Sequence, residues 1–108
     1  MNTQGWIRGL MAKNMEDDKF VRHVADCLSM EFELPVEVIE GYTIRLGQYE
    51  IAVTKEEAKN LKNSGAYELD KVLMEKLKEK GFGFDNERSQ YVRYCYSIFY
   101  KDSKGRLY

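Results

Sequence analysis

Residues 42–53, with the sequence YTIRLGQYEIAV, carry the strongest structural pattern in the chain. Apolar side chains occupy the even positions before Gly47 and the odd positions after Gln48, so the alternation reverses across these two residues. A two-residue loop that begins with glycine is typical of a type II′ turn, because its first position needs a positive φ. The sequence therefore predicts a β-hairpin in which Arg45 faces Glu50 on one side. The other side would hold three apolar pairs: Leu46 with Tyr49, Ile44 with Ile51, and Tyr42 with Val53.

Four helices are expected around this hairpin. A first helix is predicted over residues 3–13, and a second begins at Asp17 or Asp18 and ends near Leu34, because Pro35 disfavours helical geometry in the residue before it. The pattern leaves Val36 to Ile39 open between a short strand and a lead-in to the hairpin. After the hairpin, Thr54 and Glu57 have the spacing of a capping box that starts the third helix.

The fourth helix has a predicted inward stripe and a predicted stop. Gly81 is placed to end it in a left-handed conformation, and a Schellman motif there would pack Phe82 on Leu77. The apolar residues at helical spacing are Leu69, Val72, Leu73 and Leu77.

Residues 91–100 fit two periods. As a helix they align Tyr91, Tyr94, Cys95, Ile98 and Phe99, with Asp85 or Asn86 as the cap. As a strand they place Val92, Tyr94, Tyr96, Ile98 and Tyr100 on one face. We favour the strand, because β-branched and aromatic residues dominate the segment. A turn at 102–105 would then lead to a short return strand at 106–108.

Together these elements predict an α+β fold in a single domain over residues 1–108. Its small antiparallel sheet would join hairpin 42–53 to the aromatic strand near 91–100, with about four helices mainly on one face. The 108 residues are 44% hydrophobic and 32% charged, with a net charge of −1, which excludes a disordered chain. The apolar runs are too short for a membrane helix, and the N-terminus has no secretory pattern. Two cysteines make no disulfide framework, so we expect a reduced, cytoplasmic protein.

Few residue combinations suggest chemistry. His23 and Cys27 lie four apart on one helix, but structural zinc normally has four clustered protein ligands, so no metal or other cofactor is expected. A Cys–His hydrolase would need a third orienting group, and no phosphate-binding loop is present. Glu16-Asp17-Asp18 is interpreted as a solvated helix start. The sequence therefore predicts no enzyme.

Aromatic residues are the main indication of function. Trp6, five Phe and eight Tyr make up 13% of the chain, more than one small core is expected to hide. We therefore predict a protein-binding module, an inhibitor or adaptor of a larger bacterial or phage machine of the accessory or mobile-element type. The acidic segment 16–50, with a net charge of −6, would suit a basic partner surface.

The partner site is predicted in the basic, tyrosine-rich segment 88–108, which has a net charge of +4. The residues assigned to it are Tyr91, Arg93, Phe99, Lys104 and Arg106. Tyr91, Arg93 and Phe99 are expected to form an exposed patch unless a second layer or a dimer mate covers them. The alternative function is a nucleic-acid-binding regulator, in which this segment supplies basic side chains and stacking rings.

Overall fold

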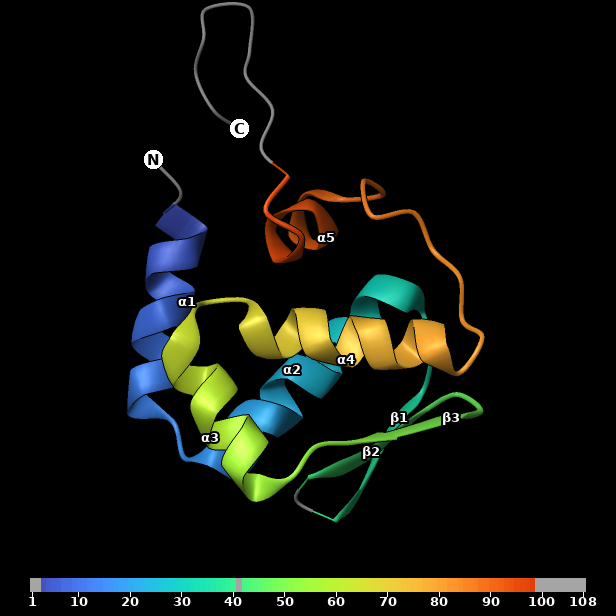
Figure 1. Cartoon of the computed structure of the whole chain (residues 1–108), viewed down its shortest axis with the longest axis horizontal. Helices are drawn as coiled ribbons and strands as arrows, with labels where there is room; N and C mark the ends of the chain where they lie inside the picture. Colours follow the sequence, from blue (N-terminus) through green and yellow to red (C-terminus); the bar gives the residue numbers. More distant parts are fainter. Residues whose placement is uncertain (1–2, 41, 99–108) are drawn as a thin grey trace, which may run out of the picture.

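The computed structural model describes residues 3–40 and 42–98 of the chain, and over these residues the fold is α+β (Figure 1). Its elements, in chain order, are α1 (Thr3–Asn14), α2 (Asp17–Phe32), β1 (Val36–Glu40), β2 (Thr43–Leu46), β3 (Tyr49–Ala52), α3 (Lys55–Ser64), α4 (Glu68–Glu79) and α5 (Gln90–Cys95). In the described part of the chain, no helix is long and apolar enough to cross a membrane.

The hairpin formed by β2 and β3 is confirmed in its register. Leu46 pairs with Tyr49, Ile44 with Ile51 and Arg45 with Glu50. Gly47 has a φ of +59°, whereas the φ of Gln48 is not positive, and this combination is the one that a type II′ turn requires. Ile44, Leu46 and Ile51 are buried, so the face that was predicted to be apolar is the face that enters the core.

The third strand of the sheet is β1, and the strand order is β1-β2-β3. Val36, Glu37 and Val38 pair antiparallel with Leu46, Arg45 and Ile44, and a bulge then follows between Val38 and Glu40. Of the two interpretations left open for Val36 to Ile39, the short strand is therefore the one that forms. Pro35 contributes to it, because its carbonyl accepts a hydrogen bond from the amide of Gly47 at 2.9 Å.

The helix ends follow the local signals. Thr54 and Glu57 form both hydrogen bonds of the capping box that was expected to start α3. At the end of α4, Gly81 has a φ of +102°, and the amide of Phe82 donates to the carbonyl of Leu77, which is the Schellman pattern. The second helix ends two residues before Leu34, with Glu33 in the left-handed region.

The prediction of an aromatic strand near 91–100 is wrong over the described residues 91–98, because residues 96–98 form no strand and residues 91–95 belong to the helix α5. Its cap is Ser89, whose hydroxyl accepts a hydrogen bond from the amide of Val92, and not Asp85 or Asn86. Helical geometry buries Val92, Tyr94 and Cys95, so packing against the core overrides the β-propensity of the individual residues. The predicted turn 102–105 and return strand 106–108 lie outside the described residues.

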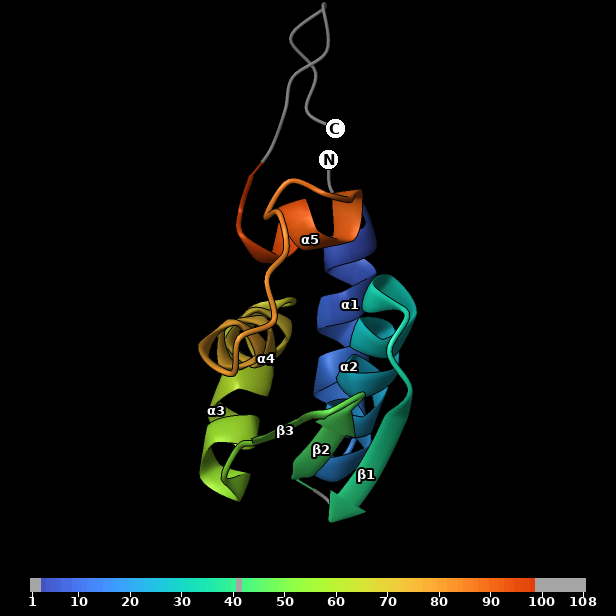
Figure 2. The same cartoon turned by 90° about the vertical axis from the view of Figure 1, so that its right-hand side faces the viewer.

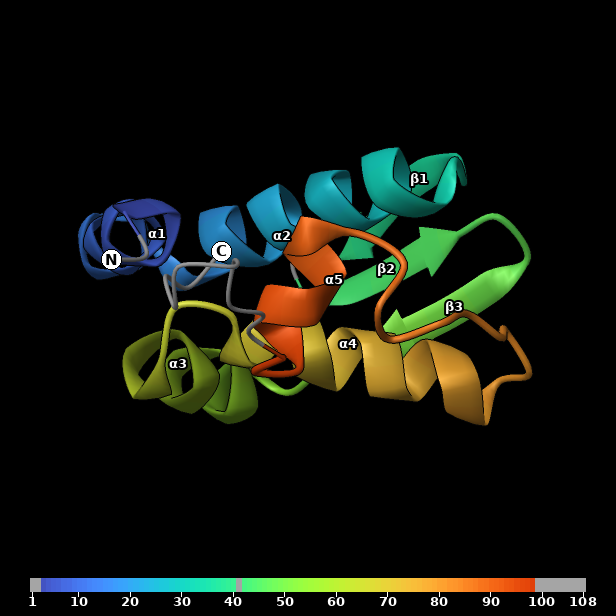
Figure 3. The same cartoon turned by 90° about the horizontal axis from the view of Figure 1, so that it is seen from above.

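The elements stack in three layers (Figure 2). The sheet lies at one end, α2 and α4 run above it, and α5 crosses over α2 and α4 on the far side (Figure 3). Contacts with the sheet come from α2, against β1 and β2, and from α4, against β3. The buried side chains form one hydrophobic cluster, whose largest members include Phe20, Leu28, Ile44, Leu46, Leu69, Leu73, Met74 and Leu77.

Candidate functional site

A buried charge network joins three helices. Arg8 on α1 donates through Nη2 to both carboxylate oxygens of Asp70 on α4, at 3.0 and 2.9 Å. Tyr91 on α5 donates its hydroxyl to Oδ2 of Asp70. Asp70 is 0% exposed and Arg8 is 6% exposed, so this ion pair is closed to solvent. The carboxylate of Asp70 accepts these three hydrogen bonds, which offset the cost of its burial and link α1, α4 and α5.

The surroundings of the network set its protonation. The guanidinium of Arg8 lies between the rings of Phe20 and Tyr67, 5.2 and 5.3 Å from their centres. Burial alone lowers the pKa of Arg8, but the charge of Asp70 and its hydrogen bonds outweigh burial and raise that pKa. Burial raises the pKa of Asp70, against the opposing effect of Arg8. Burial and the nearby carboxylate raise the pKa of Tyr91 well above its ordinary value, so Tyr91 stays a hydrogen-bond donor.

The two cysteines and the histidine lie near this network. Sγ of Cys27 and Nε2 of His23 are 3.8 Å apart on α2. Burial raises the pKa of the Cys27 thiol, and burial together with the charge of Asp70 raises that of Cys95. Both therefore stay thiols at neutral pH, the weakly nucleophilic form. Burial and the charge of Arg8 lower the pKa of His23. Among the described residues, no three His, Cys, Asp or Glu side chains are placed to hold one metal ion.

A shallow groove of about 360 Å³ runs between α2 and α5 beside the network. Cys27, Met30, Glu31 and Tyr91 line it, and Met30 is 81% exposed. Glu31 is already engaged, by an ion pair of 2.8 Å with Arg88 and by the hydroxyl of Ser89. The groove therefore offers mainly an apolar rim and few groups with which to orient a ligand.

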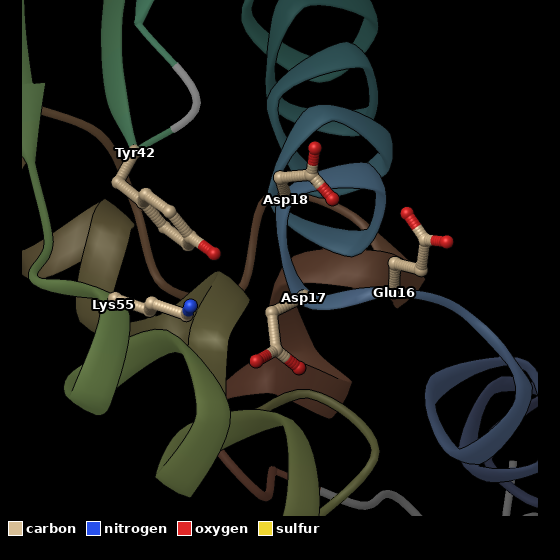
Figure 4. A pocket seen from close by; sticks show the side chains of 5 residues that line it. All are labelled: Glu16, Asp17, Asp18, Tyr42 and Lys55. Carbon is tan, nitrogen blue, oxygen red and sulfur yellow. The ribbon is translucent and has the colours of Figure 1, made fainter.

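A second hollow, of about 320 Å³, lies where α2 and α3 begin (Figure 4). Asp17 on its wall forms an ion pair of 2.8 Å with Lys62, which also donates to the carbonyl of Met15. The side chains of Glu16, Asp17, Asp18, Tyr42 and Lys55 line the hollow. The positive end of the helix dipole favours these acids, and Glu16 and Asp18 are exposed as expected for a solvated helix start, whereas Asp17 is mostly buried in its ion pair with Lys62.

The outer edge of β1 presents backbone groups that the sheet does not use. The amide of Val53 donates to the carbonyl of Tyr42, and the amide of Gly47 donates to that of Pro35. Because the hydrogen-bonding direction alternates along a strand, these two bonds fix which residues of each strand point inward. The N–H and C=O of Val36 and Val38 therefore point away from β2. Over residues 3–40 and 42–98 no hydrogen bond to these outward groups is found.

Among the described elements, α2 contacts β1, and only β2 pairs with it, so its other edge has no strand beside it. In Figure 2, β1 is the outermost strand, and its far side faces open space. The opposite edge differs, because Glu50 and Ala52 of β3 border a hollow whose other wall includes Lys76 and Lys80 at the end of α4. The open edge of β1 is therefore the best-defined candidate site in the described part of the chain.

Charge is unevenly distributed around this edge. Residues 31–40 contain four glutamates and no basic residue. At the bulge in β1, Ile39 has no partner residue on β2, and its side chain is 41% exposed. The bulge thereby brings Glu40 opposite Thr43. Since Thr43 shares a face with Arg45, Glu37 and Glu40 both lie on the solvent face of the sheet. Arg45 bridges this face, at 3.3 Å from Glu37 and 3.6 Å from Glu50.

Comparison with known proteins adds nothing to this geometry. No known protein family matches the chain, no curated protein is similar to it at a significant level, and no solved structure matches it. The function must therefore be inferred from the residues themselves.

The residues predicted to bind a partner are only partly within the described structure. Tyr91 is half-buried: it lines the groove between α2 and α5 and directs its hydroxyl inward to Asp70. Arg93 on α5 donates from Nη1 to the carbonyl of Glu87 at 3.2 Å. Phe99, Lys104 and Arg106 lie outside the described residues. Partner binding by these five residues stays a prediction.

Sequence reasoning missed the network and the open edge, although each left a signal. Asp70 lies on the inward stripe of α4, three residues before Leu73, where a charge is unusual. Val36-Glu37-Val38 alternates like a strand with one buried face. The position of this strand at the edge depends on the strand order, which no local pattern encodes.

Proposed function

We propose that this chain is a protein-binding module that accepts an extended segment of another protein beside β1. The observation that carries the proposal is the set of outward N–H and C=O groups of Val36 and Val38. A row of unpaired backbone groups at a sheet edge is a template on which a further strand can form. Each backbone hydrogen bond made there would contribute about 0.5–1.5 kcal/mol net, so four such bonds suit a specific but reversible contact.

The edge is also held ready for binding. At the end of α2, the hydroxyl of Ser29 donates to the carbonyl of Leu34, and the amide of Leu34 donates to the carbonyl of Ser29. The next residue, Pro35, accepts a hydrogen bond through its carbonyl from the amide of Gly47. Because β1 is fixed at its start and along β2, the partner loses most of the conformational freedom while this chain loses little.

Proline substitution tests this proposal with a matched control. Val38→Pro removes an N–H that points outward, so it should block an added strand without breaking a bond of the sheet. Ala52→Pro removes the corresponding outward N–H on β3, at the edge beside α4. Proteins that co-purify with the tagged wild type should also co-purify with Ala52→Pro and be lost with Val38→Pro.

Folding is checked by the thermal midpoint and circular dichroism of each variant. If Val38→Pro lowers the midpoint, Val36→Pro replaces it, because the N–H of Val36 also points outward. A partner that Val38→Pro or Val36→Pro retains as fully as the wild type would refute binding at this edge.

A further inference from the structure

We propose, resting on the function just proposed, that the segment bound beside β1 is one in which lysine or arginine alternates with apolar residues. The alternation follows from the two faces of β1. Val36 and Val38 lie opposite Leu46 and Ile44, which are buried, whereas Glu37 lies opposite the exposed Arg45. A strand added to β1 continues the same pleat, so its side chains extend these two faces in turn.

The inner face of the added strand should be apolar. Val36 packs against the hydrophobic cluster. Val36 and Val38 are both half-buried, as expected for side chains of a strand at the edge of the sheet. Apolar side chains of the added strand would bury the open flanks of Val36 and Val38, next to the contacts that α2 already makes with β1.

The solvent face of the added strand should be basic. Glu37 and Glu40 both lie on that face, and the exposed Glu33 ends α2 three residues before β1 begins. Glu37 shares Arg45 with Glu50, whereas neither Glu33 nor Glu40 has an ion-pair partner among the described residues. Opposite charges that face each other across two strands contribute about 0.2–1 kcal/mol for each pair. The edge therefore selects for basic residues at alternate positions.

The same charges disfavour a second copy of this chain as the occupant. In the antiparallel register that pairs Val36 with Val38 of the second copy, Glu37 would face Glu37 of the second copy. Like charges directly opposite are destabilising, and the bulge at Ile39 shortens the regular edge that self-pairing needs. Acidic residues and bulges protect natural sheet edges against self-association. Here they leave the edge open to a basic strand.

Peptide titration of the full chain labelled with ¹⁵N tests the inference. The probes are acetyl-Lys-Val-Lys-Val-Lys-Val-amide, its Glu-Val counterpart, and the Lys-Val peptide with N-methylated valines. The Lys-Val peptide should shift and protect from exchange the amides of Val36 and Val38, while those of Glu50 and Ala52 on the other edge stay unchanged. N-methylation should abolish these shifts, because it removes donors and blocks pairing.

Charge variants supply the second readout. Glu37→Gln with Glu40→Gln should weaken binding of the Lys-Val peptide about 2- to 30-fold, as expected for the loss of two cross-strand pairs. Should the double variant fold poorly, Glu40→Lys replaces it, because no described residue forms an ion pair with Glu40. Glu56→Lys on α3 makes the same charge change away from the sheet and should leave the affinity nearly unchanged.

The outcomes separate this inference from the proposed function. Equal or tighter binding of the Glu-Val peptide at Val36 and Val38 would overturn the basic partner but leave strand addition intact. Absence of shifts at both residues with every peptide at millimolar concentration would overturn both, and β1 would then be a protected edge. Concentration-dependent dimerisation, with protection of Val36 and Val38 in the absence of peptide, would overturn the basic partner in favour of a second copy.

Discussion

Replacement of Arg8 by methionine should destabilise the protein strongly. Met keeps much of the length of Arg8 but leaves the Asp70 carboxylate buried beside Tyr91 without its cation. Removal of one partner from a buried ion pair typically costs about 3–5 kcal/mol, a large share of the roughly 5–15 kcal/mol by which a domain is stable. For a chain of this size, a loss of that extent lowers the thermal midpoint by more than about 10 °C.

The double variant separates the ion pair from the packing of the two side chains. Arg8→Met with Asp70→Leu leaves no buried charge, and apolar replacements of buried pairs are often tolerated. The double variant should therefore lose clearly less free energy of unfolding than Arg8→Met and Asp70→Leu lose in sum, as measured by urea unfolding at pH 7. The hydroxyl of Tyr91 would then lack its acceptor, so we expect a residual cost of about 1–3 kcal/mol.

Acid should rescue the single variant in part. Without Arg8, burial raises the pKa of Asp70 further, and the folded state takes up a proton more readily than the unfolded state. Stability relative to wild type should therefore recover as the pH falls from 7 toward 4. Two results would refute the assignment of Arg8 and Asp70 as a stabilising buried ion pair. One is a loss of stability in the double variant equal to the sum of the two single losses. The other is a loss of stability in Arg8→Met that does not change with pH.

Two further predictions concern the turn and the tyrosine. Gly47→Val should cost about 2 kcal/mol, because its φ of +59° is unfavourable for a β-branched residue and the new Cβ would lie 3.1 Å from Cδ2 of Leu34. Gly83→Val is the control, because no neighbouring side chain or backbone atom would lie within 4 Å of its new Cβ. Equal thermal midpoints for the two variants would contradict the turn assignment. Stability should fall as the pH rises above 10.0, because unfolded Tyr91 ionises near that ordinary value while the folded phenol keeps its proton. Tyr91→Phe should reduce this slope by about 1.4 kcal/mol per pH unit, and an unchanged slope in alkaline urea titrations would count against the hydrogen bond to Asp70.

Local signals predicted those elements whose determinants are close in sequence. The turn at Gly47, the capping box of Thr54 and the helix stop at Gly81 each depend on a few neighbouring residues, and all three formed as expected. Residues 90–95 do not belong to this group, because their rings and β-branched side chains fit a strand and a helix equally. The cap at Ser89 was the local signal that favoured the helix.

Contacts between distant residues could not be predicted in this way. Arg8 and Asp70 are 62 residues apart, and nothing near Arg8 indicates which acid will neutralise it. The inward position of Asp70 predicted only that some partner must exist, since a buried charge without one is too costly. The same holds for β1: its alternation indicates a strand, but its open edge follows from the assembly of the whole sheet.

The position of the open edge is coupled to α5 through the end of α2. Arg88 forms an ion pair of 2.8 Å with Glu31 and lies over the ring of Phe32, and Ser89 donates to the same carboxylate while capping α5. One glutamate on the last turn of α2 therefore fixes the start of α5 on one side of the helix, while Ser29 and Leu34 fix the start of β1 on the other. Tyr91 on the same short helix donates to Asp70, so α5 contacts both the end of α2 and the buried charge network. Under the function proposed above, an edge attached in this way would keep its geometry without a partner, and such preorganisation would lower the entropic cost of binding a short strand.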